Sequence, residues 1–283
     1  MLKNLIKSIK NSTIFLWFIE NWHEKIIGTW FLLQVKGIFH LVTAKHVVEK
    51  RRQDLHVFLN SKQFNNPKAK SLSRIYTDWF NRISHNNKNV DIAILPFLLE
   101  TDDNIEFIPD SLILDKIDDI CELVDVFYTS FQPWLNSFQQ DWCVNPIIRK
   151  WTISRINNNN TFFIDWSAFP GNSWSPIFLF PTPIDFSETW TVIWWPIKIK
   201  LLWVMGAYIP YEDVAISQQT WRPKVIFEEN TWLSLIHSAI YINEIINSDL
   251  FQKQLNRLLE MNKPTPIKQN INPTNQNQQE KVN

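Results

Sequence analysis

Glycine is the residue that most limits what this chain can fold into. Only four glycines occur among its 283 residues, Gly28, Gly37, Gly171 and Gly206, whereas a chain of this length usually contains about 20. Tight turns and close backbone contacts commonly need glycine, because it has no Cβ. Tryptophan, normally rare, occurs 15 times. The two counts together equal 19, which suggests that tryptophan stands where glycine is expected.

Short apolar runs recur along most of the chain and predict strands. The runs at residues 25–35 and 38–44 flank a polar turn at Lys36-Gly37, so they predict a hairpin. Further runs lie at residues 55–59, 90–95, 122–129, 147–156, 161–164, 175–180, 197–208 and 224–227. Clusters of Asn, Pro and Asp separate them, and helical segments do not alternate with them. This pattern favours an all-β barrel or sandwich.

Both ends of the chain differ from this strand-rich middle. Residues 1–20 combine lysines with a short apolar stretch, and we expect a surface helix, with an export signal as the alternative. Residues 233–246 have apolar side chains near helical spacing, and a second helix is expected from the N-cap Ser248 to Met261. No run approaches the roughly 18 apolar residues of a membrane span, so no integral membrane segment is expected.

Charge and cysteine content exclude several classes of partner and site. The 28 basic and 28 acidic residues balance, so no net field attracts nucleic acid or an anionic membrane. Cys121 and Cys143 have no CxxC spacing and are interpreted as two free, buried thiols. Four basic residues are interpreted as part of a solvated loop: Lys62, Lys68, Lys70 and Arg74.

Three separated segments contain the candidate catalytic residues. LVTAKHVV at residues 41–48 places His46 at the end of an apolar run, and VDIAIL at residues 90–95 places Asp91 at the start of another. FPGNSWSPIF at residues 169–178 surrounds Ser173. Taken singly, each has a simpler interpretation: a partly buried histidine, a turn-capping aspartate or a serine in a surface loop.

Together the segments resemble the trypsin-like serine protease family, in its bacterial form. The family's motifs are Thr-Ala-x-His, Asp-x-Ala-x-Leu and Pro-Gly-Asn-Ser-Gly-x-Pro-Val, and this chain departs from them mainly at Trp174. The order His, Asp, Ser is that of chymotrypsin and differs from the orders in subtilisin and the α/β-hydrolases. The resemblance covers about residues 20–240 and implies two six-stranded antiparallel β-barrels with C-terminal helices.

The resemblance implies peptide-bond hydrolysis through an acyl-enzyme intermediate. His46 is expected to take the proton of Ser173, while Asp91 orients the imidazole ring. The backbone amides of Gly171 and Ser173 are expected to form the oxyanion hole. The expected partner is a protein or peptide substrate, no nucleic acid is involved, and neither a metal nor an organic cofactor is required.

Substrate preference is implied only weakly by the same resemblance. Ser167, six residues before the nucleophile, is expected at the base of the substrate pocket, with no acidic residue there to select Arg or Lys. A small or apolar preference is therefore expected. The strand that would pair with the substrate backbone contains Gly206, Ala207 and Tyr208.

The resemblance also divides the chain into parts. We expect an N-terminal extension at 1–19, a first barrel with His46 and Asp91 at 20–115, a second barrel with Ser173 at 116–231, C-terminal helices at 232–261 and a disordered tail at 262–283. The sequence does not decide the cellular compartment. The absence of paired cysteines is compatible with the cytoplasm, whereas many members of the family are exported.

Tryptophan replaces family glycines in segment after segment. Examples are GTWFL at residues 28–32, PIIRKWTIS at 146–154, KLLWVMGAY at 200–208 and ENTWL at 229–233. If glycine replaced Trp22 and Trp79, the dipeptides Asn-Trp at 21–22 and Asp-Trp at 78–79 would read Asn-Gly and Asp-Gly, which are strong turn signals. We hypothesise that these positions are UGA codons that the source organism reads as glycine. The alternative is a tryptophan-rich surface that binds carbohydrate or peptide.

Two other functions are compatible with these residues. The first is a catalytically inactive, peptide-binding module on the protease fold, with its site closed by Trp174. The second is a hydrolase or acyltransferase of another fold. The strand-rich pattern and the missing Gly-x-Ser-x-Gly elbow argue against the second.

The codon hypothesis predicts the gene sequence directly. At Trp30, Trp174 and Trp203 the codon is expected to be UGA, because the family has glycine at each of these positions. Sequencing the gene measures this, and UGG at all three positions would contradict the hypothesis.

Overall fold

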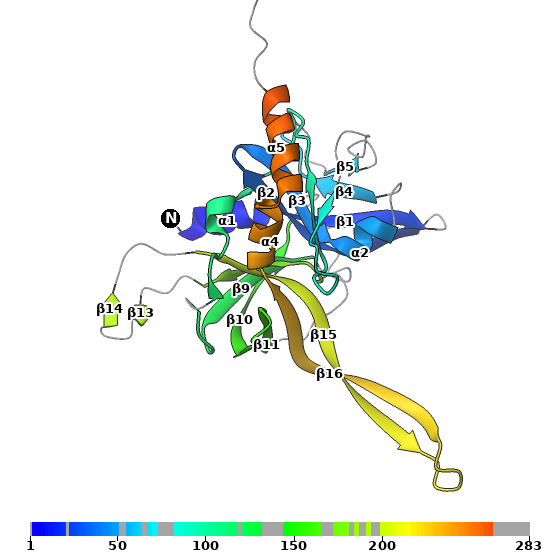
Figure 1. The fold of residues 1–283 in the computed structure, drawn as a ribbon. Coiled ribbons are helices and arrows are strands. Elements are labelled where there is room, and N and C mark those ends of the chain that lie inside the picture. The colour runs from blue at the N-terminus through cyan, green and yellow to red at the C-terminus, as the bar shows by residue number, and fades with distance from the viewer. Residues whose placement is uncertain are drawn as a thin grey trace, which may run out of the picture.

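The computed structural model describes residues 2–20, 23–50, 55–63, 67–72, 82–117, 120–131, 144–165, 172–180, 184–186, 191–193 and 199–262. Two β units lie against each other, and two C-terminal helices cover one side of the first (Figure 1). Among the described residues, no helix is long and apolar enough to cross a membrane.

The first unit is an eight-stranded sheet in the order β5-β4-β1-β2-β3-β7-β6, with β8 beside β2. Neighbouring strands of this sheet run antiparallel, except that β2 and β8 are parallel. Its strands are β1 Thr13–Glu20, β2 His23–Val35, β3 Ile38–Ala44, β4 Leu55–Leu59, β5 Lys68–Ser71, β6 Ile83–Ser84, β7 Ile92–Pro96 and β8 Ile108–Pro109. Helix α1 (Leu2–Ser12) precedes it and α2 (Lys45–Lys50) follows β3.

The second unit is a closed barrel in the order β10-β11-β16-β15-β12-β9. Its strands are β9 Asp125–Ser130, β10 Ile147–Ile156, β11 Thr161–Asp165, β12 Pro176–Leu179, β15 Leu201–Ile216 and β16 Pro223–Ser238. The 3-10 helix η1 (Asp110–Leu112) precedes it, and β13 (Ile184–Phe186) pairs separately with β14 (Thr191–Ile193). The all-β fold with C-terminal helices is therefore confirmed, and the second unit has the expected six strands. The first unit differs from the expected six-stranded antiparallel barrel, because it has eight strands and one parallel pair, β2 with β8.

Several expected boundaries differ from the structure. Residues 13–20 form β1 and pair with β2, so they belong to the first sheet and not to an extension or surface helix. At the other end, β16 continues to Ser238 because its residues 233–237 pair with β11, so the helices begin only at Ile240. Cys121 is exposed rather than buried, while Cys143 and most of the expected tail lie outside the described residues.

The turn between β2 and β3 has the geometry that the hairpin prediction requires. Lys36 and Gly37 have φ values of +48° and +82°, as in a type I′ turn, which suits the right-handed twist of the flanking strands. The strands pair from Val35↔Ile38 to Phe31↔Val42. The hairpin prediction is confirmed, and β3 is directed toward His46.

Helix α5 (Asp249–Met261) packs on the first sheet through an apolar stripe. Ser248 caps it, as predicted, by accepting a hydrogen bond from the N–H of Phe251 at 3.4 Å. The buried residues Phe251, Leu255 and Leu258 are spaced to lie on one helical face. The ring of Phe251 lies 5.0 Å from the imidazole of His40 in β3. The helix thereby covers the sheet that holds His46, together with α4 (Ile240–Ile246).

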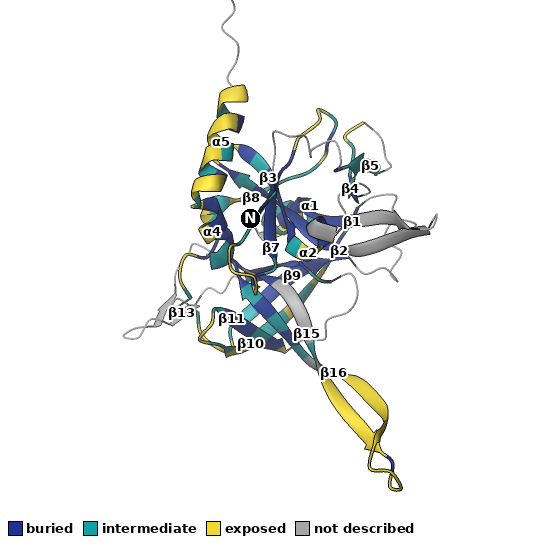
Figure 2. Cartoon of the chain, turned by 45° about the vertical axis from the view of Figure 1, so that its right-hand side comes forward, coloured by how far each residue is buried: buried dark blue, intermediate teal, exposed yellow. Residues whose placement is uncertain are grey.

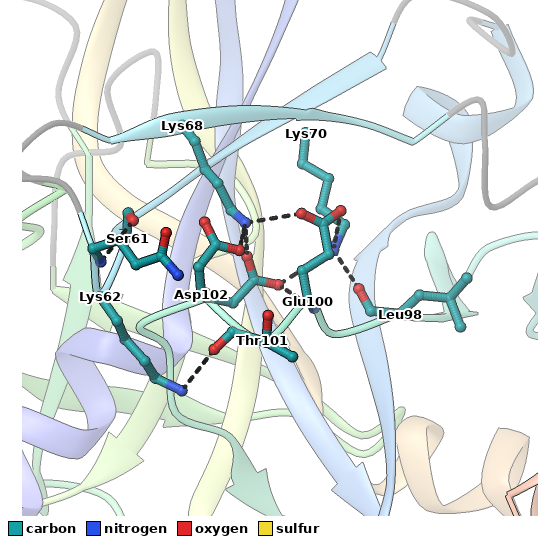
Figure 3. Close-up of polar contacts among 10 residues, drawn as sticks. Ser61, Lys62, Lys68, Lys70, Leu98, Glu100, Thr101 and Asp102 are labelled. Atoms are coloured by element: carbon teal, nitrogen blue, oxygen red, sulfur yellow. Dashed lines mark hydrogen bonds and ion pairs between the residues drawn. The ribbon is translucent and has the colours of Figure 1, made fainter.

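A cluster of ion pairs joins β5 to the segment that follows β7 (Figure 3). Lys68 Nζ lies 2.9 Å from Glu100, 2.5 Å from Asp102 and 2.6 Å from Asp103. Lys70 Nζ reaches Glu100 and Asp103 at 3.3 and 3.2 Å, and it also donates to the carbonyl of Leu98. The interpretation of Lys68 and Lys70 as solvated loop residues is therefore wrong, because the carboxylates compensate their partial burial.

Burial of His40 predicts an acid-sensitive fold. The side chain is almost fully buried, and burial lowers its pKa from 6.5 to about 4, despite a contact of Nδ1 with the Ile38 carbonyl. His40 in the unfolded chain then binds a proton more tightly than His40 in the folded protein. The contribution of neutral His40 to the free energy of unfolding is therefore fully present above pH 6.5 and is lost as the pH drops to 4. The loss is about 3 kcal/mol.

Urea denaturation of the wild type and of His40→Gln at pH 7 and pH 4 measures this effect. Acidification should destabilise the wild type by about 3 kcal/mol more than the variant, because glutamine does not titrate. An equal loss in both proteins would contradict the assignment to His40.

Candidate active site

His46 and Asp91 are brought together by the pairing of β3 with β7. Ala44, the last residue of β3, lies opposite Ile92, the first residue of β7. His46 follows directly in the first turn of α2, and Asp91 directly precedes β7. The ladder between two buried strands therefore fixes both residues at the same edge of the sheet.

The carboxylate of Asp91 contacts His46 in two places. Its Oδ1 accepts a hydrogen bond from the backbone N–H of His46 at 2.9 Å, and its Oδ2 contacts the ring Nδ1. The backbone N–H of Lys45 donates to the Asp91 carbonyl at 3.3 Å. These contacts orient the imidazole and direct Nδ1 to the carboxylate. Nε2 is then the nitrogen that can accept a proton from a nucleophile.

Ser173 lies in a tight turn between Asn172 and Ser175. The N–H of Ser175 donates to the Asn172 carbonyl at 3.1 Å, and its hydroxyl donates to the same oxygen at 2.7 Å. Trp174 occupies the third position of this turn with a φ of +70°. A type II turn has this φ at that position and strongly favours glycine. The turn therefore explains why a glycine is expected immediately after Ser173.

Strand β2 of the first unit holds the backbone of Ser173 in place. The N–H of Thr29 donates to the Ser173 carbonyl at 3.0 Å. A Cβ at Gly28 would lie 3.0 Å from that carbonyl oxygen, a separation tighter than side chains normally accept. Gly28 is thus needed for the close approach of the two backbones.

The indole of Trp174 lies beside the His46–Asp91 pair. The residue is only 3% exposed, and its ring centroid is 6.1 Å from that of His46. It also stacks, within 8° of parallel, on the ring of His237 at 6.4 Å. Within the described ranges, no hydrogen bond connects Ser173 to His46. The contact between His46 and Asp91 is therefore formed, while a hydrogen bond from Ser173 to His46 is not.

His237 is a component of this site that the sequence analysis missed. It lies in β16, its Nδ1 is buried, and no partner for that atom exists among the residues that the structure describes. Burial lowers its pKa, and the nearby Asp91 carboxylate opposes that shift. The ring is accordingly neutral near pH 7. A single histidine in an apolar strand carries no signal by which it could have been found.

Asn172, which precedes Ser173, is also fully buried. Neither Oδ1 nor Nδ2 of its amide has a hydrogen-bond partner in the described part of the chain. A buried polar group without a partner costs about 1–3 kcal/mol. The loop around Ser173 is therefore locally strained by both Asn172 and Trp174.

The other expected site residues are only partly described. Gly171 of the expected oxyanion hole and Ser167 of the expected pocket lie outside the described residues. The backbone of Gly206, Ala207 and Tyr208 lies in β15, where the last two pair with Leu235 and Ser234 of β16. Their side chains are outside the described set.

Two further tryptophans occupy environments in which an indole is unfavourable. Trp221, in the turn between β15 and β16, has a φ of +56° and is 81% exposed. Trp30 is fully buried in β2, and its indole N–H has no partner among the residues described. Together with Trp174, these positions are ones where glycine removes strain or an unpaired donor.

The described residues contain one group of acidic side chains that could hold a metal ion. Carboxylate oxygens of Glu100, Asp102 and Asp103 lie within 4.8 Å of one another. The ammonium groups of Lys68 and Lys70 already neutralise them. We therefore assign this group to the ion-pair cluster of Figure 3 and to no metal.

Comparison with known proteins agrees on the fold. No family model and no curated protein matches the sequence. Among solved structures, the scabies mite inactivated protease paralogue S-I1 is similar, with a TM-score of 0.50 and 12% sequence identity. The match covers 87% of this chain and 96% of the mite protein. With its closed six-stranded barrel and C-terminal helices, the chain has the chymotrypsin-like serine protease fold.

Proposed function

We propose that this protein is a trypsin-like serine endopeptidase with His46, Asp91 and Ser173 as its catalytic triad. The observation that carries the proposal is the double contact of Asp91 with His46, through the backbone N–H and through Nδ1. This is the arrangement that fixes the imidazole tautomer in serine proteases. The order of the three residues and the fold support the same function.

In the proposed mechanism His46 Nε2 removes the proton of Ser173 Oγ as the oxygen attacks the scissile carbonyl. Asp91 stabilises the imidazolium that forms. The backbone N–H groups of Ser173 and Gly171 stabilise the oxyanion, an effect of about 3 kcal/mol per donor. The imidazolium then donates its proton to the leaving amine, and water hydrolyses the acyl-enzyme by the reverse sequence. The strand with Gly206, Ala207 and Tyr208 and the pocket at Ser167 would hold the substrate.

A second candidate function is a catalytically inactive, peptide-binding module. The observation that favours it is the buried indole of Trp174 against the His46 ring, together with the positive φ at that residue. The similar mite structure is also described as an inactivated protease paralogue. The two candidates differ in whether Ser173 becomes reactive once the indole is removed.

A fluorophosphonate probe distinguishes the candidates, because it phosphonylates only an activated serine, with release of fluoride. We expect Trp174→Gly to label at least ten times faster than the chain with Trp174, since glycine accepts the turn's φ of +70° and frees the space beside His46. Adding Ser173→Ala to this variant should abolish the labelling. Gel fluorescence after timed incubation measures both rates.

Trp221→Gly is the matched control for this experiment. It also replaces a tryptophan with positive φ, but in the turn between β15 and β16. It should leave the labelling rate unchanged. If folded Trp174→Gly does not label, the binding module is favoured and the endopeptidase proposal fails.

A further inference from the structure

Strands β15 and β16 continue far beyond the barrel as a two-stranded arm, defined here as residues 209–230 (Figure 1). Inside the barrel, β15 pairs with β12 as far as Val204, and β16 pairs with β11 from Leu233 onward. In the arm the two strands pair only with each other, as far as the described strands show, from Pro210↔Asn230 to Ile216↔Pro223.

The arm concentrates exposed apolar side chains on a surface that nothing in the described chain covers. Strand residues 211–216 and 223–229 are all exposed (Figure 2). Of the 13 large hydrophobic side chains exposed in the described residues, seven lie on the arm: Tyr211, Val214, Ile216, Trp221, Val225, Ile226 and Phe227. Exposed apolar patches of this kind mark interaction surfaces. A two-stranded hairpin is also only marginally stable in water, so packing against a partner would stabilise it.

The register divides the arm into two faces. Directly opposed residues point to the same face, and successive residues alternate. The pairs Glu212↔Glu228 and Val214↔Ile226 therefore lie on one face, as does Ile216. We call this the Ile226 face. Lys224 has no opposed residue, because the register shifts between Ala215 and Ile216, and it lies at the distal end of the arm. The opposite face holds the pairs Tyr211↔Glu229, Asp213↔Phe227 and Ala215↔Val225.

Charge is distributed unevenly along the length of the arm. Glu212 and Glu228 lie on the barrel side of the apolar pair Val214↔Ile226. Lys224 lies on the other side of that pair, next to Arg222 in the turn. Acidic and basic groups thus flank an apolar centre at similar distances. A surface with this pattern is complementary to itself when one copy is rotated by 180°.

We propose that the arm is a dimerisation element, in which the Ile226 faces of two copies pack antiparallel about a two-fold axis at Val214 and Ile226. Such a contact buries the apolar centres of both arms. It also places the basic end of each arm, with Arg222 and Lys224, against the acidic end of the other, where Glu228 lies on the facing strand. The contact is isologous, as in most homodimers. The acidic groups on the barrel side of the arm disfavour nucleic acid as the occupant.

Sedimentation velocity at about 50 µM tests the proposal, because one face of a short arm should give a weak dimer in the micromolar range. Ile226→Asp should weaken dimerisation at least tenfold, since it places two carboxylates at the two-fold axis. The matched control is Val225→Asp, which changes the neighbouring exposed residue on the opposite face. This variant should remain dimeric. A monomeric wild type, or equal behaviour of the two variants, would overturn the proposal.

A charge exchange separates a specific contact from damage to the hairpin. Lys224→Glu alone should weaken the dimer, because it adds a carboxylate against the acidic end of the other arm, where Glu228 lies on the facing strand. Combining Lys224→Glu with Glu228→Lys restores the attraction, so the double variant should dimerise again. Unchanged thermal unfolding of each variant confirms that the barrel is folded. Failure of the double variant to recover the dimer would overturn the antiparallel arrangement.

Discussion

The contact between β2 and the Ser173 turn is the interaction on which the proposed site depends, because it joins residues from the two β units. The Thr29 N–H bonds to the Ser173 carbonyl, and the missing side chain of Gly28 allows the approach. Other buried bonds support the same seam: Thr29 Oγ1 accepts from the N–H of Phe131, and Thr13 bonds to Thr129. The proposed nucleophile, Ser173 of the second unit, is thereby fixed to the unit that contains the proposed base, His46.

The backbone conformation at two of the tryptophans is one that favours glycine. At Trp174 and Trp221 the chain adopts the left-handed region, which costs a residue with a side chain about 1–2 kcal/mol. Both positions lie in hydrogen-bonded turns: Trp174 in the turn from Asn172 to Ser175, and Trp221 in the turn between β15 and β16. Turn geometry in a β-rich chain demands glycine at such places, and the scarcity of glycine leaves tryptophan there instead. Strain and a crowded site follow from the same replacement.

The proposed endopeptidase and the arm share one pair of strands. The barrel halves of β15 and β16 include the expected substrate-pairing strand and His237, while their distal halves form the exposed arm. The barrel half of the two strands is buried or half-buried and the distal half is exposed, because β11 and β12 pair with β16 and β15 only at the barrel end. The same two strands therefore serve as core in one half and as open surface in the other.

Local patterns in the sequence determined much of this protein. The Lys36-Gly37 hairpin, the Ser248 cap of α5 and the all-β character were predictable, because turn chemistry, capping and alternation act over a few residues. The His46, Asp91 and Ser173 segments were also recognisable, since each follows a short family motif. Only the tertiary structure decided that residues 13–20 and 233–238 are strands, because their pairing partners are distant in sequence. It alone placed Trp174 beside the rings of both His46 and His237, since strand pairing and burial, rather than local propensity, bring those residues together.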